Sequence, residues 1–404
     1  MVSGIMPSIG ELVNLMGRAG DTMGTATMSK ATGIGRKVSK SVQNAAKSIQ
    51  DIIGPQEPLC RELAAAQCHI GNLGNCIKHP LYFSIPHLPQ LNGMANRGLE
   101  VKKQMVREYR EKKNWGGIIA AHEKPYRFEA LQAIEFQMSR KEFWELFADV
   151  YIGCENWYQE PNRSIIADWL MEFRCAPAKE QNKIRGYMMT KEERAEFKKL
   201  PDRLRIFRGW SRDGGERGYS WSLNIEKAEW FGRRLAEHDN AAGYAYVAWG
   251  WCQKEHAIGH FTRRGESEIF IPWEQVSVSS VDIVQFASRD ETRPVASFDF
   301  DGTLHSAVDA GGNPTSFRSD KLPPRKKVLT LMRKQAELGR RIVIVTRRDY
   351  QDLGPVLRFC ARHRLPVGTV YPTHDKPKEP YLETIKAIVH YDDHEIKHPG
   401  AIVV

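Results

Sequence analysis

One stretch decides the fold of the C-terminal part of this chain: Val295-Ala-Ser-Phe-Asp299-Phe-Asp301-Gly302-Thr303-Leu304. An apolar strand runs directly into two carboxylates that are two residues apart, and a Gly-Thr turn follows. Alternation along an extended chain places Asp299 and Asp301 on the same side. Ligands of an α/β sheet bind at the carboxyl ends of its strands, which is where these acids fall. Two hard oxygen ligands at a strand end predict a Mg²⁺ site.

The residues around this stretch predict an α/β domain over 293–404. Apolar strand patterns alternate there with amphipathic helix patterns, which predicts a parallel sheet with helices on both faces, a three-layer Rossmann-like architecture. The elements expected are Val295–Phe300, Val328–Leu338, Arg341–Val345, Leu353–His363 and Ile388–Tyr391. Pro294, which follows the charged run 289–293, is the expected domain boundary.

Three further motifs follow the first in order. One is a strand ending in Thr346, the next contains Lys378, with Lys376 as a second candidate, and the last is the acidic pair Asp392-Asp393 after an apolar strand. With the first stretch, these resemble the four motifs of the haloacid dehalogenase (HAD) superfamily of phosphatases. The resemblance covers all of 293–404.

The HAD resemblance implies a mechanism that these residue types can perform. Asp299 would attack phosphorus and form an aspartyl-phosphate. Asp301 would protonate the leaving oxygen and later activate water. Thr346 and Lys378 would hold the phosphoryl oxygens. The Mg²⁺ ligands would come from Asp299, Asp301, Asp392 and Asp393.

The short segment 305–340 between the first two motifs leaves little room for a domain that covers the site. We therefore expect a site open to large substrates, such as a polynucleotide end. Arg347, Arg348 and the basic run 325–327 either contact additional phosphates or form a solvated basic surface.

Residues 200–285 mix strand patterns with one helix and contain a second set of motifs. Arg208-Gly209 follows the strand Arg205–Phe207, Ser220-Trp-Ser222 precedes a helix at Glu226–Leu235, and Glu266-Ser-Glu268 precedes an apolar strand. Taken singly, these are common in turns, helix N-caps and solvated strand faces. In this order they resemble the α+β fold of ADP-ribosyltransferases of the arginine–serine–glutamate clade, over about 200–280, with features of phage-encoded members.

The ADP-ribosyltransferase resemblance implies NAD as the donor. Arg208 would bind the pyrophosphate, with Ser220 and Ser222 in the NAD site and Ser220 orienting Glu268. Glu268 would stabilise the positive charge that builds on the ribose as the nicotinamide bond breaks. Glu266 would accept a proton from the nucleophile, and a Glu there goes with a guanidinium acceptor. The chain departs from the family in having Trp221 where Thr is usual, and in the short segment 209–219.

The neighbouring aromatic residues Trp230 and Phe231 have two interpretations. We expect them to pack in the core rather than to stack on nicotinamide.

Residues 57–199 predict a mostly helical region. Apolar residues recur three and four apart in Ala95–Lys113 and Met138–Val150. Thr190-Lys-Glu-Glu193 matches a capping box at the start of a helix. The Trp and Tyr residues around Trp144–Trp169 are expected to form a helical core that packs against the NAD-binding domain.

Residues 1–56 differ in composition, with abundant Gly, Ser, Met, Ala and Thr and no aromatic residue. Apolar residues between Val38 and Ile52 recur at helical spacing beside basic residues. This segment is either a basic amphipathic helix that associates with a membrane surface or a virion, or a flexible tail.

The overall composition is that of an ordinary globular protein. The 404 residues suggest two or three domains. Lys and Arg total 59 against 49 Asp and Glu, and the net charge of +10 favours polyanionic partners or phosphate-bearing substrates. The seven scattered cysteines predict reduced thiols in a cytoplasm. No apolar run is long enough for a transmembrane helix, and no secretory signal is evident.

The sequence therefore predicts a bifunctional phage-type enzyme that acts in the cytoplasm of a bacterial host, with packaging in a virion as a further expectation. It would transfer ADP-ribose from NAD to a host protein and hydrolyse phosphomonoesters with Mg²⁺. One alternative is a phosphatase of nucleic-acid ends or nucleotides whose middle domain only binds a nucleotide. The other is a virion structural or ejected protein that carries two inherited folds.

Overall fold

The computed structural model describes residues 57–71, 74–154, 161–211, 215–238, 244–288, 290–306 and 323–404. The prediction of an amphipathic helix or flexible tail in 1–56 lies outside these residues. The chain forms two compact units, Met1–Glu108 and Tyr109–Val404. None of the helices within the described ranges is long and apolar enough to cross a bilayer.

The first unit contains α3 (Arg61–Ala65), a three-stranded antiparallel sheet and most of α4 (Asn92–Glu111). Leu63, Ile77, Leu81, Ala95 and Leu99 form its core. The sequence predicted mostly helix here, so the strands β1 (Gln67–Ile70), β2 (Gly74–His79) and β3 (Tyr82–Ser84) are an unpredicted feature. They are short and carry few buried apolar residues, which leaves no clear period of two in the sequence.

The second unit begins with short helices. These are α5 (Trp115–Ala121), α6 (Arg127–Gln132), α7 (Arg140–Gly153), α8 (Asn162–Cys175), α9 (Ala178–Met188) and α10 (Lys191–Lys199). The predicted capping box at Thr190 is confirmed, with the Thr190 hydroxyl accepting from the Glu193 amide. The predicted aromatic core is also confirmed, since Phe147 and Tyr151 of α7 contact Phe270 of the middle strands, at ring-centroid distances of 5.9 Å and 4.4 Å.

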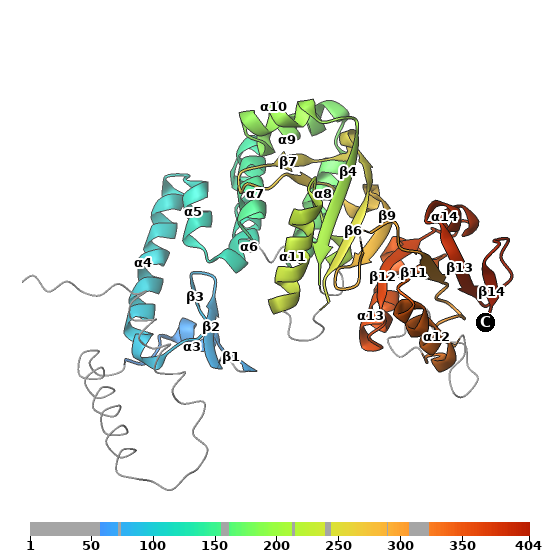
Figure 1. Cartoon of the computed structure of the whole chain (residues 1–404). Helices are drawn as coiled ribbons and strands as arrows, with labels where there is room; N and C mark the ends of the chain where they lie inside the picture. Colours follow the sequence, from blue (N-terminus) through green and yellow to red (C-terminus); the bar gives the residue numbers. More distant parts are fainter. Residues whose placement is uncertain are drawn as a thin grey trace, which may run out of the picture. The chain divides into compact units, whose positions relative to one another are not determined.

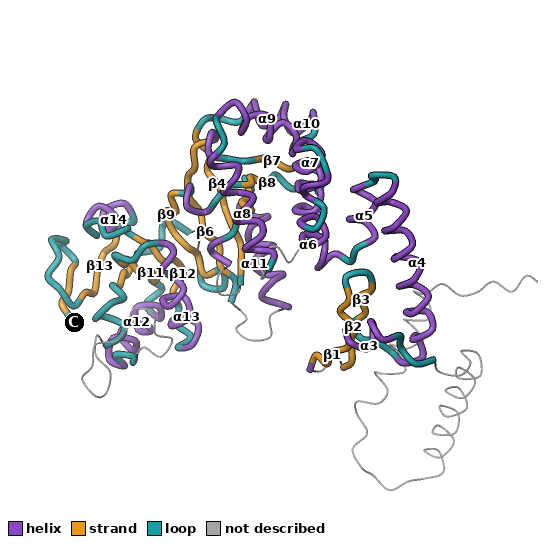
Figure 2. The backbone as a smooth tube through the Cα atoms, turned by 180° about the vertical axis from the view of Figure 1, so that it is seen from behind, coloured by secondary structure: helices purple, strands orange, loops and turns teal. Residues whose placement is uncertain are grey.

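One sheet of eleven strands runs through the rest of the second unit, in the order β14-β13-β10-β11-β12-β9-β6-β4-β5-β8-β7. Figure 2 shows strands of this sheet in orange. The middle strands pair antiparallel: β4 (Arg203–Trp210), β5 (Ser220–Ser222), β6 (Tyr246–Gln253), β7 (Gly259–Phe261), β8 (Glu268–Phe270) and β9 (Ser277–Ile283). The helix α11 (Ile225–His238) packs against β4 and β6 (Figure 1).

The C-terminal strands pair parallel, as the sequence predicted. They are β10 (Val295–Phe298), β11 (Arg341–Thr346), β12 (Val367–Pro372), β13 (Ala387–Asp392) and β14 (Ala401–Val403). The helices α12 (Lys326–Glu337) and α13 (Gly354–Arg362) share a core with Ala296 and Phe298. Leu382 of α14 (Glu379–Thr384) packs with Val295. Adjacent strand residues face opposite sides, so helices cover both faces of this part.

The boundary expected at Pro294 lies directly before β10. The sheet is continuous across it, because β9 pairs antiparallel with β12 through Asp282↔Thr369 and Val281↔Val370. Apolar residues from both sides of Pro294 also share one core. The two sets of motifs therefore lie on one continuous sheet.

Candidate active sites

The first candidate site lies where three parallel strands end together. In the sheet order β10 lies between β13 and β11. The chain therefore continues from β10 to β11 on one side and later adds β13 on the other side. Such a switch point opens a crevice at the carboxyl ends of the strands. Asp299 and Asp301 follow β10, Thr346 ends β11 and Asp392 ends β13. The topology therefore brings the predicted residues to the same edge.

The carboxylates of Asp299 and Asp392 converge on one ammonium group. Lys378 Nζ lies 2.5 Å from Asp299 Oδ1 and 2.7 Å from Asp392 Oδ2. All three side chains are buried, whereas the alternative Lys376 is exposed. Burial raises the pKa of Asp299 to about 6, with Lys378 opposing the rise and Asp392 adding to it. Hydrogen bonds from His390 and Lys378 outweigh burial at Asp392 and hold its pKa below the usual range.

The Asp301 carboxylate has different partners. Arg348 forms two hydrogen bonds to this carboxylate, from Nε to Oδ2 at 2.9 Å and from Nη2 to Oδ1 at 2.7 Å. His305 Nε2 lies 3.1 Å from Oδ1. Thr346 Oγ1 is 3.5 Å from Oδ2. Although burial acts in the opposite direction, Arg348 and His305 lower the pKa of Asp301 to about 2. Arg348 is thus buried in the site, while its neighbour Arg347 is exposed.

The Gly-Thr turn after the strand has a structural reason. Gly302 has a φ of +77°, and a Cβ there would overlap the carboxylate of Asp393. The Thr303 hydroxyl lies 3.3 Å from Asp299 Oδ2 and 3.3 Å from Asp393 Oδ1. Arg325, from the basic run 325–327, donates to the Gly302 carbonyl at 2.7 Å. Only a glycine allows the chain to turn this close to Asp393.

The donor set fits a Mg²⁺ ion. Asp299 and Asp392 already place oxygens around one point that a cation, the Lys378 ammonium, occupies. Ligand atoms of Asp392, Asp393 and His394 also lie within 4.8 Å of one another. Carboxylate oxygens are the ligands that Mg²⁺ prefers. Arg348 binds the Asp301 carboxylate in this structure, so the role of Asp301 as a Mg²⁺ ligand stays a prediction.

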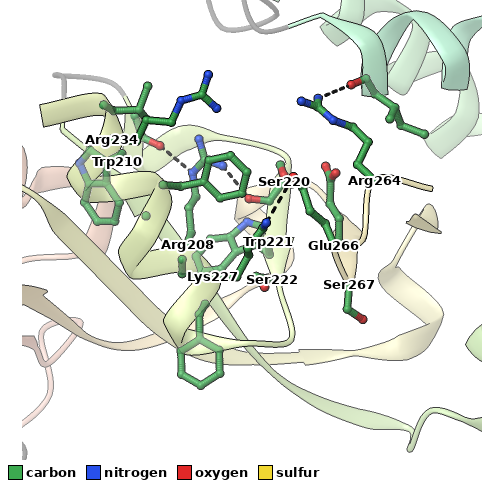
Figure 3. A pocket seen from close by; sticks show the side chains of 18 of the residues that line it. Arg208, Trp210, Ser220, Trp221, Ser222, Lys227, Arg234, Arg264, Glu266 and Ser267 are labelled. Atoms are coloured by element: carbon green, nitrogen blue, oxygen red, sulfur yellow. Dashed lines mark hydrogen bonds and ion pairs between the residues drawn. The ribbon is translucent and has the colours of Figure 1, made fainter. Parts of the chain in front are cut away.

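The second candidate site is a cavity of about 220 Å³ among the middle strands, α11 and the end of α7. The residues that the sequence predicted for NAD binding all line this cavity: Arg208, Ser220, Ser222, Glu266 and Glu268. Residues that the sequence analysis did not select also line it: Tyr151, Ile152, Cys154, Lys227, Arg234 and Arg264. Figure 3 shows Arg264 and Glu266 pointing to one side of the loop that precedes β8 and Ser267 pointing to the other.

Arg208 is buried at the wall of this cavity. Its Nε donates to the Gly215 carbonyl at 2.7 Å and its Nη1 to the Ser220 carbonyl at 2.6 Å (Figure 3). The guanidinium therefore also fixes the chain between β4 and β5, and a Cβ on Gly218 would overlap it. A charged group held this way is preorganised to meet an anion.

Glu268 is a half-buried carboxyl group of the cavity wall. Burial raises its pKa to about 7, the Ser220 hydrogen bond opposes the rise, and Glu266 adds to it. The Ser222 hydroxyl accepts from the Asn224 amide at 3.0 Å, and Asn224 Oδ1 accepts from the Lys227 amide at the start of α11. Ser220 thus contacts the acid, whereas Ser222 shapes the turn into the helix.

The cavity has features that fit NAD. It contains cationic side chains for a pyrophosphate, aromatic walls, and Ser211, whose buried hydroxyl has no hydrogen-bond partner among the described residues. Lys227 Nζ lies 3.9 Å from Glu266 Oε1. The prediction that Trp230 and Phe231 pack in the core is wrong. The Trp230 side chain is 47% exposed, and Phe231 lines the cavity.

The loop after β11, beside the first candidate site, contacts a turn beside the second candidate site. Tyr350, two residues after Arg348, is buried and donates its hydroxyl to the Glu216 carbonyl at 2.9 Å. Arg217 Nη2 donates to the Gln351 carbonyl at 3.3 Å. The turn Gly215–Arg217 also provides the carbonyl that holds Arg208. The two sites therefore share a supporting segment.

Comparison with protein-family models, with curated proteins and with solved structures finds no match to this chain.

Proposed function

We propose that the C-terminal site hydrolyses phosphomonoesters with the help of Mg²⁺. The observation that supports this most strongly is the convergence of Asp299 and Asp392 on Lys378 at the switch point of the parallel sheet. Mg²⁺, when bound, supplies positive charge that offsets repulsion between an anionic nucleophile and an anionic substrate.

The side chains would divide the reaction as follows. An Asp299 oxygen forms a bond to phosphorus as the bond to the leaving oxygen breaks, which gives an aspartyl-phosphate. Lys378 and Thr346 hold the phosphoryl oxygens. Water then attacks phosphorus, releases phosphate and regenerates Asp299.

Asp301 would supply a proton to the leaving oxygen and later remove one from water. The lowered pKa of Asp301 suits the second task, since the hydrogen bonds from Arg348 favour its carboxylate form. For the first task, a substrate phosphate would attract Arg348 away from Asp301. In this proposal Arg348 binds the substrate phosphate.

The test is hydrolysis of p-nitrophenyl phosphate and of 3′- and 5′-phosphorylated oligonucleotides, with and without Mg²⁺. Asp299→Asn is expected to lower kcat by about 10³-fold or more, because the nucleophile is removed. Asp168→Asn, an exposed carboxylate on α8, is the matched control and should retain activity. Activity that survives Asp299→Asn, or that needs no divalent ion, contradicts the proposal.

We further propose that the cavity transfers ADP-ribose from NAD. It is supported by Arg208, Ser220 and the half-buried Glu268, which line one cavity together with Ser211, whose hydroxyl has no hydrogen-bond partner among the described residues. The bond between ribose C1′ and nicotinamide breaks, nicotinamide leaves with the electron pair, and an acceptor nitrogen bonds to C1′. Glu268 stabilises the charge on the ribose and Glu266 takes the acceptor's proton.

Labelled NAD and bacterial lysate test this proposal by released nicotinamide and by mass spectrometry for added ADP-ribose on arginine. Glu268→Gln is expected to abolish both signals, while Glu255→Gln, whose side chain is 80% exposed, should leave them unchanged. Absence of both signals for the unaltered chain would leave phosphate hydrolysis as its activity.

A further inference from the structure

Two arginines and two tryptophans share one face of the middle strands. Arg203 and Arg205 are alternate residues of β4, and Trp249 and Trp251 are alternate residues of β6. In the antiparallel pairing Arg205 is opposite Trp251 and Phe207 is opposite Trp249. Paired residues, and residues two apart on a strand, project to the same side of a sheet. We call these four residues the arginine–tryptophan face.

Each guanidinium of this face lies over an indole ring. Arg203 Cζ is 4.4 Å from the Trp251 ring centroid, and Arg205 Cζ is 4.8 Å from that of Trp249. Both arginines are exposed and both indoles are half-buried. In the part of the chain that the structure describes, neither arginine forms an ion pair with a carboxylate. Their charges are therefore available to an anionic ligand.

The helix α11 covers only part of this side of the sheet. Phe207, the next residue of β4 on the same face, packs with Ala228 and Ala236 of α11. Gly209 lies directly against the Ala228 carbonyl. The start of β4 and the end of β6 extend beyond this contact, and exposed Ser277 of β9 continues the row beside Trp251.

We propose that the arginine–tryptophan face binds single-stranded nucleic acid. Indole and guanidinium planes offer stacking surfaces to unpaired bases, and the arginine charges attract phosphates. The net charge of +10 favours the same partner. A duplex has its bases already stacked inside, and an acidic peptide carries charge without rings. Single strands alone use both features of the face.

The test is fluorescence anisotropy of the full chain with labelled single-stranded RNA and DNA of about 12 nucleotides, within the site sizes of related surfaces. Arg203→Gln/Arg205→Gln is expected to weaken binding about tenfold or more. It should also reduce the slope of log K against log salt by about 1.4, roughly 0.7 for each phosphate contact. Trp251→Leu is expected to weaken binding about 5- to 150-fold through lost stacking.

The matched control is Arg233→Gln/Lys334→Gln, which removes the same charge from two exposed helix positions. It should retain the affinity and salt slope of the unaltered chain. The proposal would be overturned if the unaltered chain bound no single strand, or if both double variants lost the same affinity. It would also be overturned if the chain bound duplex as tightly as single strands, or if polyglutamate competed as well as a single strand does. If Trp251→Leu fails to fold, the arginine variants decide the matter.

Discussion

The raised pKa of Glu268 predicts that this residue destabilises the fold at the pH where it would work. Its pKa lies at about 7 instead of the ordinary 4.5, because burial disfavours the carboxylate. Between these two pH values the folded chain binds more protons than the unfolded chain, so stability falls as pH rises from about 4.5 to about 7. Glu268→Gln removes this dependence and keeps a carbonyl oxygen that can accept from Ser220.

The magnitude follows from the two pKa values. Multiplying the difference between 7 and 4.5 by about 1.36 kcal/mol per pH unit gives an upper limit of about 3.4 kcal/mol above pH 7. Because the group is half-buried and solvent screens part of the effect, we expect about 1–3 kcal/mol. Glu268→Gln should therefore be more stable than the unaltered chain by about this amount at pH 8, and nearly equal to it at pH 4.5.

Urea unfolding of both proteins at pH 4.5 and pH 8 measures the difference. Glu255→Gln serves as the control and should change stability by less than about 0.5 kcal/mol at either pH. A stability gain of Glu268→Gln that is the same at both pH values would refute the electrostatic reasoning. So would a loss of stability at pH 8.

Three further predictions concern Tyr350, Gly302 and Glu268. Tyr350→Phe removes the hydrogen bond to the Glu216 carbonyl, which supports the turn that holds Arg208. The KM for NAD should therefore rise about 2- to 12-fold, while kcat for phosphate hydrolysis should stay unchanged. An unchanged KM in steady-state assays contradicts this prediction. Gly302→Ala forces a Cβ into the Asp393 carboxylate at a φ of +77°, so thermal unfolding should show a loss of about 1–3 kcal/mol and phosphatase assays a loss of activity. ADP-ribosyl transfer should rise with pH through about 7 as Glu268 ionises, and a flat profile of kcat/KM would count against its role.

Motif order in the sequence predicted which residues lie close together at the two candidate sites. Asp299, Thr346 and Asp392 each follow an apolar strand, and parallel strands end at one edge, so their proximity could be derived before the structure. Of the two candidate lysines, Lys378 is the one that is buried beside Asp299, and its role in binding phosphate stays a prediction.

Long-range contacts could not be derived in this way. Nothing local marks Arg348 as the partner of Asp301, because an Arg-Arg pair after a strand has the same pattern on a solvated surface. Tyr151 enters the cavity from a helix far earlier in the chain, and its sequence pattern is that of any core aromatic residue. Trp230 was assigned to the core because it is apolar, yet cations beside its ring allow it to be exposed.

The loop after β11 links the two candidate sites. Arg348 donates toward Asp301, and Tyr350, two residues later, donates toward the turn that fixes Arg208. The strand pair β9–β12 and the shared apolar core prevent the two halves from separating without breaking buried contacts. Removal of residues 293–404 would therefore take away Tyr350, expose apolar surface of the middle strands and loosen the support of Arg208. Loss of NAD binding in such a truncated segment would therefore not contradict NAD binding by the cavity of the full chain. Point variants such as Tyr350→Phe leave the sheet intact and test NAD binding directly.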